Sequence, residues 1–129
     1  MNENESWFHI KGKGRLEAIL MKDDWSIWIH DGDDSFTFMT PLGEREYWPD
    51  ILAWKDREGW VVFEVDGKKG HWSKRDLQKM KLRDDTFQAN DIGTVRIKNR
   101  DLVGKHQQPT DLILSEISYQ RYGKLTLSN

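Results

Sequence analysis

The sequence predicts an α+β (α/β) fold with a single mixed β-sheet, a central hairpin and few flanking helices, in one domain over residues 1–129. Two observations predict this fold. Apolar and polar side chains alternate in short stretches between residues 25 and 66, as expected of strands with one buried face. Beyond them, residues 73–82 carry the start signals of a helix. The alternative is a mostly-β meander or barrel with one helix.

The N-terminal third is expected to contain an edge strand, a short helix and a hairpin. Ser6–Lys11 mixes apolar and polar residues and is interpreted as an edge strand that two glycines end. In Arg15–Lys22 the apolar residues follow helical spacing, which predicts a short helix. Trp25–His30 and Ser35–Thr40 both alternate, and the Asp-Gly pair between them predicts that these two strands form a hairpin.

A second hairpin is predicted from strands at about residues 46–54 and 60–66, with Lys55–Gly59 as the loop. Pairing Trp54 with Trp60 aligns the strands and places Leu52 opposite Val62. The side-chain period of two then gives one continuous apolar face, formed by Ile51, Ala53, Val61, Phe63 and Val65. Toward its open end the opposite face carries three carboxylates, those of Asp50, Glu64 and Asp66.

The helix signals begin at Ser73, whose hydroxyl suits an N-cap, with Asp76 placed to complete a capping box. They predict a helix over Lys74–Leu82, with Trp72 packed against its first turn. Its expected buried residues are Leu77 and Met80.

The C-terminal third is expected to add two strands. Gly93–Lys98 and Asp111–Tyr119 are both interpreted as strands because they are rich in β-branched or aromatic residues. A polar loop around Lys105–Thr110, which contains Pro109, separates them.

Three carboxylates at one end of a hairpin require a compensating cation, which is either a lysine or arginine side chain or a divalent metal ion. Like charges on directly opposite residues destabilise a sheet. Oxygen ligands of this kind suit Mg²⁺ or Mn²⁺ rather than a softer metal. The sequence therefore predicts a metal site formed by Asp50, Glu64 and Asp66.

The hairpin resembles that of the PD-(D/E)xK, or restriction-endonuclease-like, nucleases. The matching residues are Pro49-Asp50 and then Glu64-Val65-Asp66 at the end of an apolar strand. The resemblance covers about residues 15–83 and implies one helix before the hairpin, which supplies Glu17, and one after it. It implies a small metal-dependent DNA endonuclease or a degenerate nuclease-like domain.

The resemblance also implies a mechanism. Asp50 and Glu64 would hold the metal, with Glu17 binding through water, and the metal would lower the pKa of a bound water and stabilise charge on the scissile phosphate. The family has a lysine where this chain has Asp66. Lys68, one pleat further along the same face, or the adjacent Lys69 is therefore expected to orient the nucleophile, and Lys68 is taken as the fourth catalytic residue.

Basic residues are concentrated directly after the hairpin. Residues 1–66 contain 15 acidic and 7 basic side chains, whereas residues 67–83 contain seven basic side chains and one acidic. A compact basic segment suits contact with a phosphate backbone, and a solvated helix face is the alternative. The predicted nucleic-acid contacts are Lys69, Lys74, Arg75, Lys79 and Lys81.

A non-catalytic, acidic protein-binding module, such as a bacterial toxin-immunity protein or a phage-encoded inhibitor, is the second functional interpretation. The chain is short, has a net charge of −2 and carries seven tryptophans, all in its first 72 residues. Tryptophan is enriched where protein partners bind, and acidic inhibitors bind basic surfaces by charge complementarity. The expected partner is then a basic protein, and no metal is needed.

Several classes of protein are excluded by composition. The chain has no cysteine, so it has neither disulfides nor a thiolate zinc site. No apolar run approaches the about 20 residues of a membrane-spanning helix. The polar, acidic N-terminus lacks the features of a secretory signal. A cytoplasmic protein without membrane contact is therefore expected.

Overall fold

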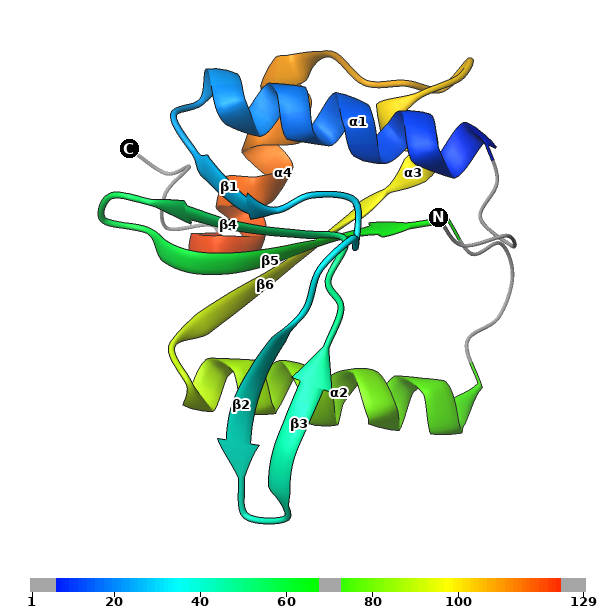
Figure 1. Cartoon of the computed structure of the whole chain (residues 1–129). Coiled ribbons are helices and arrows are strands. Elements are labelled where there is room, and N and C mark those ends of the chain that lie inside the picture. The colour runs from blue at the N-terminus through cyan, green and yellow to red at the C-terminus, as the bar shows by residue number, and fades with distance from the viewer. Residues whose placement is uncertain (1–6, 68–72, 124–129) are drawn as a thin grey trace.

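The computed structural model describes residues 7–67 and 73–123 and has an α+β fold. A four-stranded mixed sheet has the order β1-β4-β5-β6, and a separate two-stranded sheet pairs β2 with β3 (Figure 1). The strands are β1 (Ser26–Ile29), β2 (Phe36–Thr40), β3 (Gly43–Tyr47), β4 (Ile51–Lys55), β5 (Gly59–Asp66) and β6 (Ile92–Lys98). The helices are α1 (Trp7–Lys22), α2 (Lys74–Ala89), α3 (Asn99–Leu102) and α4 (Thr110–Tyr122).

The main sheet lies between two layers. Helices α1, α3 and α4 cover one face, and α2 with the β2–β3 hairpin covers the other (Figure 1). The first face buries a core built around Phe63, to which α1 contributes Leu16 and Leu20 and α4 contributes Ile113 and Ile117. The second face has a smaller core of Ile29, Leu52, Val62 and Phe87.

The central hairpin β4–β5 has the predicted register, but its first strand is shorter than the predicted 46–54, because β4 begins at Ile51 and residues 46–47 belong to β3, which pairs with β2. Trp54 pairs with Trp60 and Leu52 with Val62, so the predicted apolar face is buried against α1 and α4. The turn is compatible with this register because Arg57 and Gly59 both adopt a positive φ, of 72° and 78°. β1 and β4 are antiparallel, as are β4 and β5, whereas β5 and β6 are parallel and are connected through α2.

The predicted pairing of Trp25–His30 with Ser35–Thr40 is wrong. β1 pairs with β4, and β2 pairs with β3 across the short turn at Pro41. The Asp-Gly pair does form a tight bend, since Asp31 and Gly32 have φ values of 53° and 70°. The Gly32 N–H, however, donates to the Asp50 carbonyl (2.9 Å), which joins the bend to the start of β4 rather than closing a hairpin.

Two predicted strands are helices. Ser6–Lys11 was expected to be an edge strand, but its described residues begin α1, which continues through both glycines because Gly12 packs closely against Asn99 of α3. Asp111–Tyr119 lies within α4, where Ile113 and Ile117 are four residues apart and face the sheet together. In both segments burial of an apolar face outweighs the local strand preference.

Helix α2 begins as predicted and ends later. Ser73 caps it, and Ser73 and Asp76 form both hydrogen bonds of a capping box. The helix continues beyond Leu82 to Ala89, and its buried residue is Phe87. Leu77 is exposed and Met80 only partly buried, contrary to the expectation that both are core. Trp72 lies outside the described residues.

The C-terminal third contains one of its two predicted strands and the predicted loop. The predicted strand Gly93–Lys98 is confirmed as β6, and the polar loop before α4 is present. None of the described helices has the length and apolar character required to cross a bilayer.

Candidate active site

Asp50 and Glu64 lie next to each other at the open end of the central hairpin. Asp50 directly precedes β4. Glu64 directly follows Phe63, the last residue of β5 that pairs with β4. The Asp50 amide donates to Glu64 Oε2 (3.3 Å), and the Val65 amide donates to Asp50 Oδ2 (2.9 Å). The register of the hairpin thus brings these two carboxylates together, as the sequence predicted.

Glu64 is held in surroundings that favour its neutral form. The Tyr47 hydroxyl donates a hydrogen bond to Glu64 Oε1, which by itself lowers the pKa of Glu64, but two larger effects act in the opposite direction. Burial, together with the negative charge of Asp50, raises the pKa of Glu64 to about 7. Burial and the charge of Glu64 raise the pKa of Tyr47 as well, so this hydroxyl remains a hydrogen-bond donor. Two acidic groups therefore share a site in which one additional positive charge is stabilising.

One face of α1 is turned toward this carboxylate pair. His9, Lys13 and Glu17 follow each other at intervals of four residues and so lie along one stripe of the helix. His9 Nε2 is 2.8 Å from the Val65 carbonyl oxygen, and Glu17 Oε1 is 2.5 Å from Nδ1 of His30. The stripe therefore lies over the end of β5 and the loop that follows β1.

Lys13 is the basic residue closest to the carboxylates. Its side chain is almost fully buried, with 2% of the residue exposed. Nζ lies 3.8 Å from Asp50 Oδ1 and donates to the Asp31 carbonyl oxygen at 3.3 Å. A buried ammonium group is stable only beside anionic or hydrogen-bonding partners, and Asp50 is such a partner. The sequence reasoning missed Lys13 because it treated this part of the chain as a break before the helix.

The remaining predicted site residues are distributed differently. Glu17 comes from the helix before the hairpin, as expected, but its carboxylate interacts with His30. Asp66 lies two residues beyond Glu64 on β5. Over residues 7–67 and 73–123, no three His, Asp or Glu side chains are grouped closely enough to hold a metal ion between them. Lys68 and Lys69 lie outside the described residues.

The carboxylate pair nonetheless has the chemistry of a site for a hard divalent cation. Mg²⁺ is commonly bound through one or two carboxylates, with water and substrate phosphates completing its shell. Asp50 and Glu64 supply two such groups, and burial together with the negative charge of Asp50 raises the pKa of Glu64. They are two of the three carboxylates that the sequence predicted as metal ligands.

Helix α2 carries four of the predicted basic side chains on its exposed surface. Lys74, Arg75, Lys79 and Lys81 are all exposed, although Lys81 Nζ is 2.8 Å from the Asp85 carboxylate. The helix contacts the site itself through Arg83, whose guanidinium lies 4.8 Å from the centre of the Tyr47 ring. Its position on the sheet is held by Asp84, which forms a two-pronged ion pair with Arg96 of β6 at 2.7 and 3.0 Å.

Comparisons of this chain with protein-family models, with curated proteins and with solved structures found no match.

Proposed function

We propose that this protein is a small metal-dependent endonuclease that cleaves phosphodiester bonds of DNA. The observation that carries the proposal is the Asp50–Glu64 pair at the end of the central hairpin, with the buried Lys13 ammonium 3.8 Å from Asp50. Two carboxylates and one lysine at a common point are the groups that the resemblance to PD-(D/E)xK nucleases implies. Here the lysine comes from the preceding helix rather than from β5.

The order of the elements supports the same proposal. Helix α1 precedes the hairpin and carries Glu17, and α2 follows β5 and returns the chain to a parallel strand. Both helices are where the resemblance implies them. Fold alone does not establish function, so the weight rests on the side chains.

Each residue of the site has a chemical role in this proposal. Asp50 and Glu64 hold the divalent cation, which supplies a water of lowered pKa and neutralises charge on the scissile phosphate. Tyr47 fixes the Glu64 carboxylate by its hydrogen bond. Lys13 lies beside Asp50 and can donate a hydrogen bond to a phosphate oxygen or to the attacking water. The exposed lysines of α2 hold the backbone without reading its sequence.

The test is cleavage of labelled single-stranded and duplex DNA in Mg²⁺ or Mn²⁺. Asp50→Asn, Glu64→Gln and Lys13→Met are each expected to lower the cleavage rate by at least about 100-fold, since each removes a charge at the reacting phosphate. Asp56→Asn, at an exposed position in the β4–β5 turn, is the matched control and keeps full activity. Circular dichroism checks that every variant is folded.

Two results would contradict the nuclease proposal. One is the absence of cleavage by the wild-type protein with either metal, at both low and physiological salt. The other is cleavage that survives in Asp50→Asn and Glu64→Gln, which would point to a contaminating enzyme or to a different site.

A protein-binding role is the second candidate, and a tryptophan patch favours it. The patch consists of Trp28, Trp54 and Trp60, all exposed, with the Trp28 and Trp60 rings 5.3 Å apart and Trp54 opposite Trp60. Exposed clusters of tryptophan are typical of protein interfaces. The exposed acidic residues Asp56 and Asp91 belong to the turns before β5 and β6, beside this patch, and so favour a basic partner.

The protein-binding role predicts a partner that depends on these rings. Capture from a lysate of the native cells should recover a basic protein with wild-type bait and lose it with Trp28→Ala/Trp60→Ala. Because the partner is held partly by charge, its binding should weaken as salt is raised. Recovery of nucleic acid alone would count against this role.

A further inference from the structure

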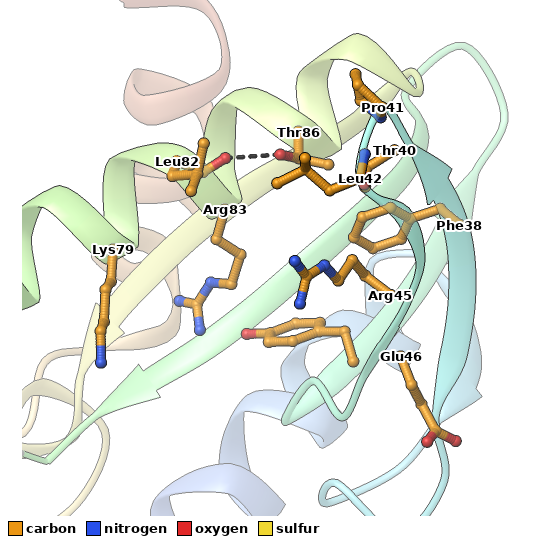
Figure 2. A pocket seen from close by; sticks show the side chains of 11 residues that line it. Phe38, Thr40, Pro41, Leu42, Arg45, Glu46, Lys79, Leu82, Arg83 and Thr86 are labelled. Carbon is orange, nitrogen blue, oxygen red and sulfur yellow. Dashed lines mark hydrogen bonds between the residues drawn. The ribbon is translucent and has the colours of Figure 1, made fainter.

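A pocket of about 600 Å³ lies between α2 and the β2–β3 hairpin (Figure 2). Its walls are largely apolar: Phe38 and Leu42 come from the hairpin side, and Leu82 from α2. Leu42 is 83% exposed and Leu82 70% exposed, so both leave large apolar surfaces open to solvent at its mouth. This size and lining are typical of sites for small ligands.

Three basic side chains converge on the same pocket. Lys79 and Arg83 enter from α2, and Arg45 enters from β3 on the opposite wall (Figure 2). Within the described parts of the chain, none of the three forms an ion pair with a carboxylate. Buried Nε of Arg83 also lacks a hydrogen-bond partner there. Glu46 lines the pocket too, but its carboxylate accepts a hydrogen bond from the Ser35 hydroxyl (2.8 Å).

These features together specify the chemistry of an occupant. Several cations without an ion-pair partner around one space are stabilised by an anionic group, and the charge of Arg83 is offset only in part by its interaction with Glu64. Apolar and aromatic walls favour a flat, weakly polar body, for which Phe38 and the plane of the Arg83 guanidinium are suitable surfaces. A nucleotide has both parts, an aromatic base and a phosphate.

The pocket is also connected to the carboxylate pair. Tyr47 lines the pocket, and its hydroxyl donates to Glu64. Arg83 also lines the pocket, its guanidinium lies 4.8 Å from the centre of the Tyr47 ring, and its charge acts on Glu64. A nucleotide in the pocket is thus separated from the carboxylates by little more than one side chain.

We propose that this pocket receives the base of an unpaired nucleotide, with Arg45, Lys79 and Arg83 holding its phosphates. The inference rests on the proposed function, and it names the substrate class: single-stranded nucleic acid, or a duplex with a locally unpaired base. A paired and stacked base cannot enter such a pocket, because the duplex would first have to open.

The test measures base recognition without cleavage. Fluorescence anisotropy in EDTA compares a labelled oligothymidylate hexamer with a hexamer of the same backbone in which every base is replaced by an abasic tetrahydrofuran. The wild-type protein is expected to bind the thymidylate at least about fivefold more tightly, because one stacked base is worth about that much. Removing metal keeps the substrate intact.

Variants locate the base-binding surface. Leu42→Gln/Leu82→Gln makes the pocket mouth polar without adding charge, and both positions are exposed, so the fold is kept. We expect this double variant to bind thymidylate as weakly as the abasic hexamer, with abasic binding unchanged. Leu112→Gln, at an exposed position of α4 on the other side of the sheet, is the matched control and retains the preference for thymidylate. Arg45→Gln should weaken the binding of both oligonucleotides equally.

Other outcomes separate this inference from the nuclease proposal. If the wild-type protein binds the two hexamers equally, or binds neither of them, the proposal that the pocket receives a base is wrong, even if the protein cleaves DNA. A preference for thymidylate that survives in Leu42→Gln/Leu82→Gln also overturns it and places the stacking elsewhere. If the preference depends on the pocket but no metal-dependent cleavage occurs, the base site stands and the nuclease proposal fails.

Discussion

Glu64 shows how strongly one residue's surroundings determine its charge. A solvated glutamate has an ordinary pKa of 4.5, whereas burial and the neighbouring Asp50 raise that of Glu64 to about 7. Between these two pH values the folded protein holds a proton that the unfolded chain releases. Glu64 therefore makes the protein less stable as the pH rises through this window.

Replacing Glu64 isolates this effect. Relative to Glu64→Gln, the wild-type protein should lose up to about 3 kcal/mol of unfolding free energy between pH 4.5 and pH 7, with no further loss above it. Urea unfolding at the two pH values measures the difference. Glu44→Gln, at an exposed position of β3, serves as the control. If the difference in unfolding free energy between the wild-type protein and Glu64→Gln does not change with pH, the surroundings of Glu64 do not favour its neutral form.

The same residue links metal binding to pH. If the proposed metal site is present, a divalent cation on Asp50 and Glu64 would have to displace the proton that Glu64 holds below about pH 7. Calorimetry should therefore find that Mn²⁺ affinity increases with pH up to about 7 and then levels off. In Glu64→Gln this dependence is lost together with most of the affinity.

At the scale of secondary structure, α1 is the element that builds the site. It carries His9, Lys13 and Glu17 on one stripe. It also packs against α3, and this contact helps to fix its position. At Gly12 an added Cβ would collide with the side chain of Asn99, which is itself buried. At Gly14 an added Cβ would meet nothing within 4 Å.

The two glycines of α1 therefore predict opposite effects of the same substitution. Gly12→Ala should destabilise the protein by about 1–3 kcal/mol, because α1 must move away from α3. Gly14→Ala should stabilise it by about 0.5–1 kcal/mol, since alanine is the better helix former and the position is open. Thermal or urea unfolding of both variants measures this. Stabilisation by both substitutions would mean that α1 and α3 are not in close contact.

At the scale of the whole molecule, the β2–β3 hairpin is held mainly by aromatic packing. Its strands pair with each other and not with the main sheet. Phe87 of α2 lies 5.7 Å from Phe36, 5.4 Å from Phe38 and 4.8 Å from Tyr47, measured between ring centres. This cluster therefore positions both the pocket and the Tyr47 hydroxyl.

Removing the Phe87 ring should release the hairpin. Phe87→Ala is expected to cost about 3–5 kcal/mol of stability, because Phe87 is completely buried and its loss leaves a cavity. Hydrogen exchange should show the protection of β2 and β3 falling further than that of β4 and β5. Ile113→Ala, in the core on the other face of the sheet, is the comparison variant. Equal loss of protection in both variants would contradict a separate role for the second core.

The features that could be predicted from the sequence are those that depend on neighbouring residues. The register of β4 and β5 follows from period-two alternation across a short turn, and this register alone places Asp50 beside Glu64. The capping box of Ser73 and Asp76 is equally local, and it was predicted correctly. Such features are readable because the interacting groups lie within a few residues or follow one regular period.

The helical state of α1 and α4, the partner of β1 and the position of Lys13 could not be predicted in this way. Each depends on contacts between segments far apart in the chain: Gly12 with Asn99, Ile113 and Ile117 with the sheet, and Lys13 with Asp50. The free energy of burying those faces exceeds the local preference that suggested strands or a break. The preference of a segment for helix or strand depends on its neighbours in the sequence, whereas its burial depends on which surfaces meet in the folded chain. For that reason Lys13 could not be identified from the sequence.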